Sequence, residues 1–392
     1  MKYKLADICF YAKGKIDVSG LTDTHYISTE NMLPNKGGVT TASSLPSIAQ
    51  AQAYRKGDVL VSNIRPYFKK IWFADCNGGC SNDVLVFRAK EDTDAGFLYY
   101  VLANDAFFDY STATSKGTKM PRGDKTAIMQ YEVPHFELST QKKIAGILSD
   151  IDDKIVLNAR INNNLEQQAQ AIYNNMVPYS VDDILPTEWY KGTVEDIIEI
   201  HDSKRIPLSG QARQKMEKKT YPYYGAASLM DYVDDYIFEG KYLLLGEDGT
   251  VVDAAGFPIL QYVWGKFWVN NHAHILTGKH GFTVESLMLL FRRTPVKSIV
   301  TGAVQPKISQ ANLKSIPVVI PSEAVLSELN NAIEPLFAQI RVNIEENKSL
   351  AALRDALLPK LMSGEIDVSD ITFSATNLLF ITYPITSVGG GS

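Results

Sequence analysis

The sequence predicts an α+β protein in which two mixed α/β globular domains are each followed by a long helix. The two helices are expected to pair as an antiparallel coiled coil, so that the chain forms an internal pseudo-twofold repeat. Three observations predict this architecture. The chain has 392 residues, 45% of them hydrophobic, which is enough for two cores. One segment recurs at a fixed offset, and both copies run into an apolar row with helical spacing.

The repeat is strongest in the second part of each copy. The segment GTKMPRGDKTAIMQYEVP from Gly117 matches GAVQPKISQANLKSIPVV from Gly302, an offset of 302 − 117 = 185 residues. Each segment has a proline four residues on, at Pro121 and Pro306. The same offset then holds without a gap through the helical rows, whereas the upstream parts diverge. There, GKYLLLGEDG occupies roughly the place of KGDVLVSNIRP.

The two globular domains are predicted over residues 1–138 and 191–321. Both contain short β-rich runs separated by glycine, proline and asparagine, among them DVLVSNI, VLVFRA, YLLLGE, FWVNNHAHIL and SIPVVI. A helix is expected over AGFLYYVLANDAFFDYS in the first domain and over VESLMLLFRR in the second. Residues 177–190 carry prolines and acidic residues without a period, so we expect a linker there.

Spacer helices are predicted at residues 139–176 and 322–363. Apolar residues recur there in steps of four and three, which is typical of a coiled coil. Ser139 and Ser322 offer N-caps at the helix starts. Pro335 lies inside the second row, where it removes a backbone hydrogen bond and clashes with the preceding turn. We therefore expect a kink or a short break near Asn331.

Two asparagines interrupt the centre of each apolar row, Asn158 and Asn162 in the first helix and Asn343 and Asn347 in the second. A buried asparagine fixes the register of a coiled coil at some cost in stability. Antiparallel pairing then predicts that Asn158 lies near Asn347 and Asn162 near Asn343. The alternative is that these side chains only cap or hydrate a weakly packed stretch of surface helix.

The composition restricts the class of protein. No apolar run approaches the roughly 20 residues of a membrane-spanning helix, and the start MKYKLADICF lacks the hydrophobic stretch of a signal peptide. The three cysteines, Cys9, Cys76 and Cys80, suit free thiols in a reducing compartment, so we expect a cytoplasmic protein. Residues 364–392 are predicted to be a tail, whose final SVGGGS is typical of an added flexible linker.

Local basic stretches favour a nucleic-acid partner, although the net charge of the chain is −5. The balance of charged residues is +4 over residues 55–70, +3 over 110–125 and +4 over 201–219. Arginine and lysine can neutralise phosphates or contact guanine edges. A charged stretch is more often a solvated face, but a helix of about 36 residues spans about 54 Å. That length could separate DNA half-sites about 34 to 36 Å apart.

Motifs for catalysis or metal binding are absent or weak. The sequence has no phosphate loop of the G-x-x-x-x-G-K type. It also lacks the N-P-P or D-P-P motif, followed by an aromatic residue, that ends a strand in adenine methyltransferases. The cysteine spacing is unlike that of zinc sites. His272 and His274 alternate on a predicted strand, for which we favour a structural role over a metal pair. The segment GEDG from Gly246 is predicted to be a tight turn. Its carboxylates would position a basic side chain or accept hydrogen bonds from cytosine amino groups.

Taken together, these residues resemble the specificity subunits of Type I restriction-modification systems over nearly the whole chain. The most specific pieces are QKKIAGILSDIDDKIVLNARINNNLEQQAQAIYNNM from Gln141 and ALRDALLPKLMSGEIDV from Ala352 to Val368. KGDVLVSNIRPYFKK, GKYLLLGEDG, WVNNHAHIL and the GTKMPRGD segment add weaker similarity to target-recognition domains. Pro335 and the residues after Asp370 depart from the family pattern.

The resemblance implies a non-catalytic DNA-binding chain in which each target-recognition domain reads half of a bipartite site. The two helices would set the distance across the unspecified gap between the half-sites. It implies docking of two methyltransferase subunits and, in the full complex, two restriction subunits that are motor-nucleases. S-adenosylmethionine, ATP and magnesium would then be bound by the partner subunits and not by this chain. The alternatives are a stand-alone DNA-binding regulator, a specificity chain of another restriction class, and a self-contained enzyme.

The expected DNA contacts lie in the basic stretches and in the repeated loop segment. They are Arg65, Lys69, Lys116, Thr118, Lys119 and Arg122 in the first domain, and Lys204, Arg205, Gln305 and Lys307 in the second.

Overall fold

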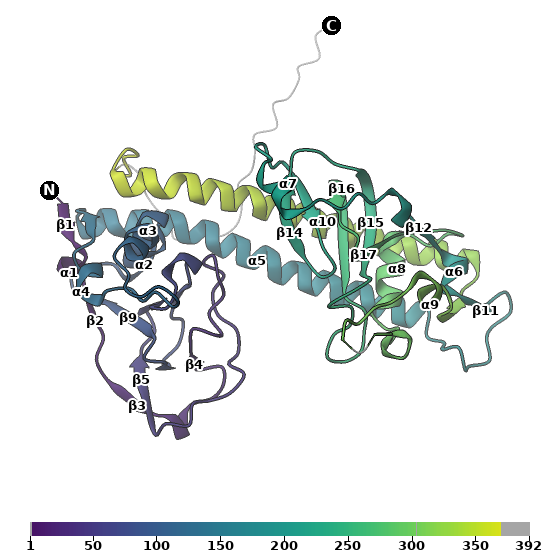
Figure 1. Cartoon of the computed structure of the whole chain (residues 1–392), viewed down its shortest axis with the longest axis horizontal. Helices are drawn as coiled ribbons and strands as arrows, with labels where there is room; N and C mark the ends of the chain where they lie inside the picture. The colour runs from purple at the N-terminus through teal and green to yellow at the C-terminus, as the bar shows by residue number, and fades with distance from the viewer. Residues whose placement is uncertain (1, 303, 370–392) are drawn as a thin grey trace, which may run out of the picture. The chain divides into compact units, whose positions relative to one another are not determined.

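The computed structural model describes residues 2–302 and 304–369 (Figure 1). The chain divides into two compact units, which are residues 1–157 with 347–392 (unit 1) and residues 158–346 (unit 2). Helices α5 (Leu138–Met176) and α10 (Glu323–Ser363) each contribute residues to both units. Most of the predicted tail, from residue 370 onward, lies outside the described residues.

Unit 1 contains three small sheets beside its helices. Their strand orders are β1-β10, β2-β9-β6-β7 and β3-β5-β8-β4. The elements are β1 (Lys2–Lys4), α1 (Leu5–Ile8), β2 (Cys9–Tyr11), β3 (Lys15–Asp17), η1 (Val18–Gly20), β4 (Tyr26–Ile27), β5 (Gln50–Tyr54), β6 (Val59–Ser62), η2 (Pro66–Phe68), β7 (Ile71–Phe73), β8 (Gly78–Cys80), β9 (Val84–Ala89), α2 (Ala95–Ala103), α3 (Asp105–Ala113), α4 (Lys125–Ile128) and β10 (Glu132–Pro134).

Unit 2 has a two-stranded sheet, β11-β18, and a six-stranded sheet in the order β12-β17-β15-β16-β13-β14. Figure 1 shows α8 lying against this larger sheet. The elements are β11 (Tyr190–Thr193), α6 (Val194–Ile197), β12 (Ile198–Ile200), η3 (Asp202–Lys204), α7 (Gly210–Gln214), β13 (Tyr221–Tyr224), β14 (Leu229–Val233), β15 (Phe238–Gly246), β16 (Leu260–Val269), β17 (Ala273–Gly278), α8 (Val284–Phe291), η4 (Lys297–Ile299), α9 (Gln310–Lys314) and β18 (Pro317–Ile320).

The internal repeat extends over six strands of each unit, well beyond the segment in which the sequences match, whereas β3-β5-β8-β4 of unit 1 and β13-β14 of unit 2 differ in arrangement. The order β2-β9-β6-β7 in unit 1 corresponds strand by strand to β12-β17-β15-β16 in unit 2. In both units, a strand at the start of the globule pairs antiparallel with the strand that precedes a long helix, as β1-β10 and as β11-β18. The diverged sequences therefore build one shared frame, which agrees with the predicted α+β class.

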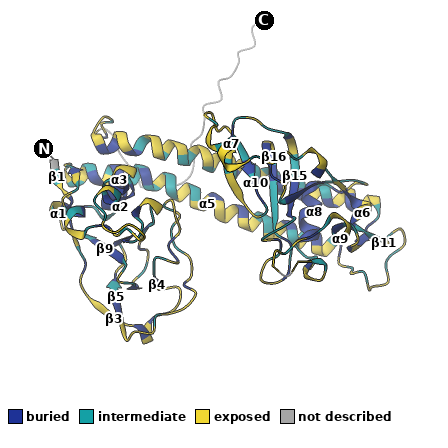
Figure 2. Cartoon of the chain, viewed as in Figure 1, coloured by how far each residue is buried: buried dark blue, intermediate teal, exposed yellow. Residues whose placement is uncertain are grey.

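Each unit has its own hydrophobic core, to which the long helices contribute. In unit 1, Ile144 and Leu148 of α5 and Leu361 of α10 are buried in one cluster with residues of the sheet and of α2 and α3. In unit 2, Ala169 of α5 and Ile333 of α10 are buried in the corresponding cluster. Figure 2 shows buried positions alternating with exposed ones along α5 and α10. The helices are thus amphipathic parts of the globules, as the apolar rows predicted.

Two predictions about the helices and one about a strand are wrong in detail. Every residue of α10 from Glu323 to Ser363 is helical, so of the kink or short break expected near Asn331, the short break does not occur. The single helix expected over residues 95–111 is two helices, because the extended Asn104 caps α3 by accepting from the N–H of Ala106 at 3.0 Å. His272 lies in the turn before β17, outside the strand in which it was predicted.

The long helices pair antiparallel within each unit. In unit 2, the amide of Asn343 donates to Oδ1 of Asn162 at 2.8 Å, and both side chains are buried, as predicted. Asn158, also in unit 2, donates to Glu346 at 2.7 Å. In unit 1, Asn347 donates to the carbonyl of Ile155 at 3.1 Å. The predicted pair of Asn158 with Asn347 joins residues of different units and stays a prediction.

Among the helices of the described residues, none combines the length and the apolar composition that spanning a membrane requires.

The buried asparagine pair allows a direct stability test. We expect Asn162→Leu to lower the free energy of unfolding by about 1 to 3 kcal/mol, because it leaves a buried amide of Asn343 without its acceptor. The double variant N162L/N343L should recover most of this loss, since the two apolar groups then pack together. Urea unfolding of the three chains measures both values. A double variant as unstable as the single one would contradict the role of the pair.

Candidate nucleic-acid interface

The segment with the strongest repeat folds into the same exposed loop in both units. We call it the hairpin loop, residues 116–122 in unit 1 and, among the described residues of unit 2, 301–302 and 304–307. Lys116 and Arg122 exchange backbone hydrogen bonds of 2.8 and 2.9 Å across the first loop. Thr301 and Lys307 exchange bonds of 2.9 and 2.8 Å across the second. The repeat in the sequence therefore encodes one closed loop twice.

The glycine that begins each repeated segment is required by the loop. Gly117 and Gly302 have φ values of +95° and +86°, a region that other residues rarely adopt. A Cβ atom on Gly302 would also lie 2.3 Å from the carbonyl oxygen of Gln305. Backbone geometry explains why this glycine recurs while the loop side chains differ.

Each hairpin loop is attached to the turn that follows a central strand. We call this the strand-end turn, residues 63–66 after β6 and 247–250 after β15. In unit 1, the N–H of Arg65 donates to the carbonyl of Pro121 at 2.8 Å. In unit 2, the N–H of Gly249 donates to the carbonyl of Pro306 at 2.9 Å. The recurring proline therefore marks the position where the two loops join.

A second bond in each unit fixes the end of the hairpin loop. The N–H of Gly123 donates to the backbone carbonyl of Asn63 at 3.1 Å, and the N–H of Ile308 donates to the backbone carbonyl of Glu247 at 2.8 Å. A short helix then begins in both units, capped by the side chain of Asp124 before α4 and of Ser309 before α9. The hairpin loop is thus an exposed element on a rigid base, an arrangement suited to positioning recognition side chains.

The unit 1 residues predicted to contact DNA are brought together here. Lys116, Thr118, Lys119 and Arg122 are all exposed on the hairpin loop, and Arg65 lies in the adjoining turn. Lys116 pairs with Asp124 at 2.5 Å, and Arg122 with Asp83 at 3.1 Å. These exposed ion pairs are weak and leave both cations accessible.

Lys69 follows the same turn and pairs with Asp105 at 3.0 Å. Its side chain is only partly exposed, so it is less accessible than the cations of the hairpin loop.

The unit 2 residues fall into two groups. Gln305 and Lys307 are exposed on the hairpin loop, and Lys204 is exposed on the nearby η3. Arg205 has a side chain that is 13% exposed, and its Nη1 atom donates to Glu247 at 2.5 Å and to the carbonyl of Ala273 at 2.9 Å. This environment favours a structural role for Arg205 over the DNA contact that the basic stretch suggested.

A buried polar network lies beneath the unit 2 loop. His274 is fully buried, its Nδ1 lies 2.6 Å from Asp202, and its Nε2 lies 2.8 Å from the carbonyl of Ile308. Asp202 also accepts from the N–H of Ile275 at 3.0 Å and from Gln310 at 2.6 Å. The network connects η3, β17 and α9 to Ile308, the residue that follows the hairpin loop.

Glu247 connects this network to the surface. One of its oxygens accepts from Arg205 and the other lies 3.1 Å from Nζ of Lys307. The GEDG turn therefore positions basic side chains, which is one of its two predicted roles. Burial by itself raises the pKa values of Asp202 and Glu247, but hydrogen bonds from His274 and Arg205 respectively outweigh it and hold both below their usual range.

The same residues resemble a metal site in composition but not in bonding. Ligand atoms of Asp202, Glu247 and His274 lie within 4.8 Å of one another. Both nitrogens of His274 already face oxygen acceptors, while Arg205 and Lys307 neutralise the carboxylates. These contacts favour an ion-pair network, which agrees with the structural role expected for His274. Asp202 and Gln310 were not among the predicted residues, because neither stands in a motif and only the fold brings them to His274.

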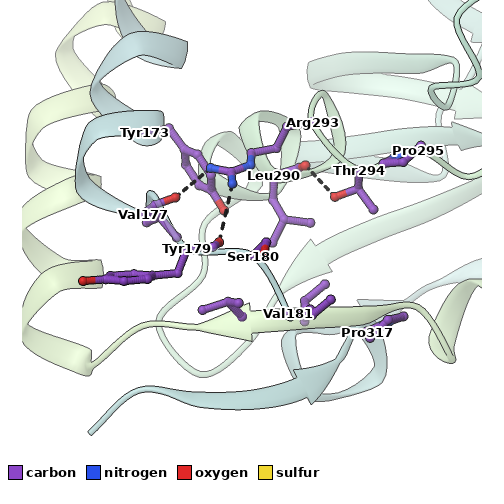
Figure 3. Close-up of a pocket in the computed structure, with 12 residues that line it drawn as sticks. Tyr173, Val177, Tyr179, Ser180, Val181, Leu290, Arg293, Thr294, Pro295 and Pro317 are labelled. Atoms are coloured by element: carbon purple, nitrogen blue, oxygen red, sulfur yellow. Dashed lines mark hydrogen bonds between the residues drawn. The ribbon is translucent and has the colours of Figure 1, made fainter. Parts of the chain in front are cut away.

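A hollow of about 210 Å³ elsewhere in unit 2 has a different character (Figure 3). It lies between the end of α5 and β18, and its lining is mostly apolar, including Val177, Leu290 and Pro317. Its cation, Arg293, donates to the carbonyls of Val177 and Tyr179 and lies over the ring of Tyr173. The hollow therefore offers little for phosphate binding.

Comparisons with known proteins agree with the two-part architecture. The family model described as Type I restriction modification DNA specificity domain matches residues 1–167 and residues 186–347. The chain is 24% identical to the Type I restriction enzyme MjaIX specificity subunit of Methanocaldococcus jannaschii, over 72% of this chain and 71% of that protein. It is 30% identical to the HindI specificity subunit of Haemophilus influenzae over 44% of this chain, a match that spans 40% of the relative.

A solved structure has the same fold. The S subunit of a Type I restriction-modification system from M. genitalium superposes with a TM-score of 0.55, covering 92% of this chain and 96% of the other. The two sequences are 17% identical, so this likeness concerns the fold.

Proposed function

The chain belongs to the family of Type I restriction modification DNA specificity domains, and from this premise we propose that each of its units reads one half of a two-part DNA target. The chain is the non-catalytic specificity subunit of a Type I restriction-modification system and recognises the DNA target of that system. We assign the two target-recognition domains to residues 1–138 and 191–321, with the spacer helices between and after them.

The observation that carries this proposal is the recurrence of one loop arrangement with unlike side chains. Both hairpin loops rest on a strand-end turn through equivalent backbone bonds. The side chains at equivalent positions differ, with Lys119 and Arg122 in unit 1 and Val304 and Lys307 in unit 2. A shared base with different exposed side chains suits two readers of different sequences, because base edges distinguish donors, acceptors and methyl groups.

Chemistry is assigned to partner chains. Two methyltransferase subunits bind S-adenosylmethionine and methylate adenine, and two restriction subunits use ATP and magnesium as motor-nucleases in the full cytoplasmic complex. This chain sets the distance between the two half-sites. That distance depends on the register of the two long helices, which the pair of Asn162 with Asn343 and the other antiparallel helix contacts fix.

A methylation map tests the proposal. DNA is sequenced for modified adenine from cells that express this chain with and without its neighbouring methyltransferase. We expect adenine methylation at a two-part, asymmetric motif only when both are present. Sequence-specific binding by this chain alone, without complex formation or methylation, would favour a stand-alone regulator instead.

Substitutions on the two hairpin loops should affect opposite halves of the target. We expect Arg122→Ala and Lys307→Ala each to weaken binding by about 1 to 3 kcal/mol and to relax one half-site only, because each is exposed on a different unit. Binding of the assembled complex to a panel of half-site variants measures this. Lys13→Ala, another exposed cation of unit 1, is the matched control. Equal weakening on every DNA sequence would make either residue a phosphate contact.

A further inference from the structure

The turn η2 in unit 1 presents two neighbouring aromatic rings to solvent. Tyr67 is 48% exposed and Phe68 is 39% exposed. Their ring centroids lie 4.8 Å apart, with the ring planes tilted by 55°. Neither ring belongs to a hydrophobic core, so the globule does not require aromatic side chains at these positions.

The backbone of this turn is held in a fixed and unusual conformation. Arg65 and Lys69, on either side of it, have φ values of +49° and +51°, which non-glycine residues rarely adopt. A neighbouring loop supports the turn through backbone bonds of 2.8 Å, from Asn35 to Phe68 and from Lys36 to Lys69. A strained conformation that the surroundings enforce is typical of functional positions. The backbone that carries the two rings is therefore fixed in place.

Partly exposed cations lie on and beside this turn. Lys70 lies over the ring of Phe68 at 6.0 Å. Lys36 and Lys69 share one carboxylate, Asp105, at 2.9 and 3.0 Å, so two positive charges face one negative charge. Arg65 joins the turn to the hairpin loop through its bond to Pro121. Positive charge around an apolar tip complements DNA, in which the bases lie between rows of phosphates.

Unit 2 has no such feature at the corresponding turn of its described residues. The N–H of Arg65 and the N–H of Gly249 each donate to the recurring proline of the hairpin loop, so these two residues are equivalent. Counting on from them aligns Tyr67 with Val251 and Phe68 with Val252. Val251 is 1% exposed and belongs to the unit 2 core. The repeat frame therefore accommodates a buried aliphatic side chain here, and the exposed rings are a property of unit 1 alone.

We propose that Tyr67 and Phe68 form an aromatic wedge that inserts against a base step within the first half-site and partly unstacks it. The rings would contribute to recognition through the deformability of that step as well as through contact, so unit 1 would distort its half-site more than unit 2. This inference rests on the proposed function, because it needs unit 1 to bind duplex DNA at a defined position.

The test uses the full chain assembled with its methyltransferase subunit. Duplexes carry the mapped target with 2-aminopurine at successive positions of each half-site, excluding the adenines that are methylated. With the unsubstituted chain we expect fluorescence to rise several-fold at one step of the first half-site. The variant Y67A/F68A should lose this signal and bind the target on the order of tenfold more weakly, as expected for a lost stacking contact.

Two further variants separate the wedge from general effects. Ile48→Ala removes another side chain of unit 1 that is 49% exposed and should leave the signal unchanged. Y67L/F68L keeps apolar bulk without aromatic faces and should restore part of the binding. Unfolding in urea should match the unsubstituted chain for all of these variants, since the rings lie outside the cores.

The outcomes distinguish failure of the wedge from failure of the function. If the unsubstituted complex shows no preference for its mapped target, the proposed function fails first. If it prefers the target but no base step responds, or if Y67A/F68A keeps the response, the wedge is wrong. Weaker capture of the methyltransferase subunit with an unchanged DNA signal would also overturn it, because the rings would then serve a protein interface.

Discussion

Replacing Asp202 with alanine is expected to lower the free energy of unfolding of unit 2 by about 3 to 5 kcal/mol. The carboxylate is buried and holds His274, Gln310 and the N–H of Ile275 at once. Its removal leaves the buried His274 without its carboxylate and opens the junction of η3, β17 and α9. Three of the four tryptophans, at positions 189, 264 and 268, lie in unit 2, so the change in tryptophan fluorescence with urea measures this transition.

The same variant predicts a dependence on pH. The folded-state pKa of Asp202 is held below its usual range, so its ionised form stabilises the fold above the unfolded pKa of about 4. This contribution is lost as the pH falls below about 4, through the folded-state pKa. The difference in stability between the unsubstituted chain and D202A should therefore be full at pH 7 and should shrink in acid.

Asp202→Asn and Asp182→Ala serve as controls. The asparagine keeps the size of the side chain and one acceptor, so it should cost less than the alanine. Asp182 is exposed in the same unit, and its removal should change stability by less than about 0.5 kcal/mol. If D202A were no more harmful than D182A, the buried network would contribute nothing to the base of the unit 2 loop.

The helices were the most predictable part of the fold, because their signals are local and repeated. Apolar steps of four and three predicted long helices where α5 and α10 lie, although Ser139, expected as an N-cap, is inside α5. The short break, one of the two outcomes expected near Asn331, does not occur, since the backbone bond lost at Pro335 is a local cost and packing of Ile333 and Phe337 in the core outweighs it. The split at Asn104 follows from a side-chain cap that an apolar pattern does not reveal.

The candidate interface was predictable as a segment but not in its bonding. Gly117, Gly302 and the two prolines marked the loops, because backbone constraints leave a sequence signal. The partners of each basic residue carry no such signal. Lys307 and Arg205 look alike in sequence, yet one is exposed on the loop and the other is enclosed by Glu247 and backbone carbonyls. Contacts between residues far apart in the chain decide which cations are free to meet DNA.

Replacing Glu285 with alanine should have a comparable effect at the attachment of α10 to unit 2. This carboxylate on α8 is fully buried and lies 2.7 Å from Lys241 of β15, 2.6 Å from the hydroxyl of Tyr262 on β16 and 3.3 Å from Arg341 of α10. It therefore joins the sheet, α8 and the spacer helix. We expect a loss of about 3 kcal/mol or more, because the mostly buried Arg341 would keep only the half-exposed Glu334 of its two carboxylate partners.

The functional consequence of E285A should be one-sided. The fold of unit 1 does not involve Glu285, so discrimination at the second half-site should weaken while the amides of unit 1 keep their protection from hydrogen exchange. Glu334→Gln is the matched control, since Glu334 pairs with the same Lys241 and Arg341 but is 44% exposed, where an ion pair contributes about 1 kcal/mol or less. Equal losses for E285A and E334Q would show that burial of Glu285 adds nothing. A larger loss for E285A would show that this buried carboxylate holds α10 against α8 and the sheet of unit 2.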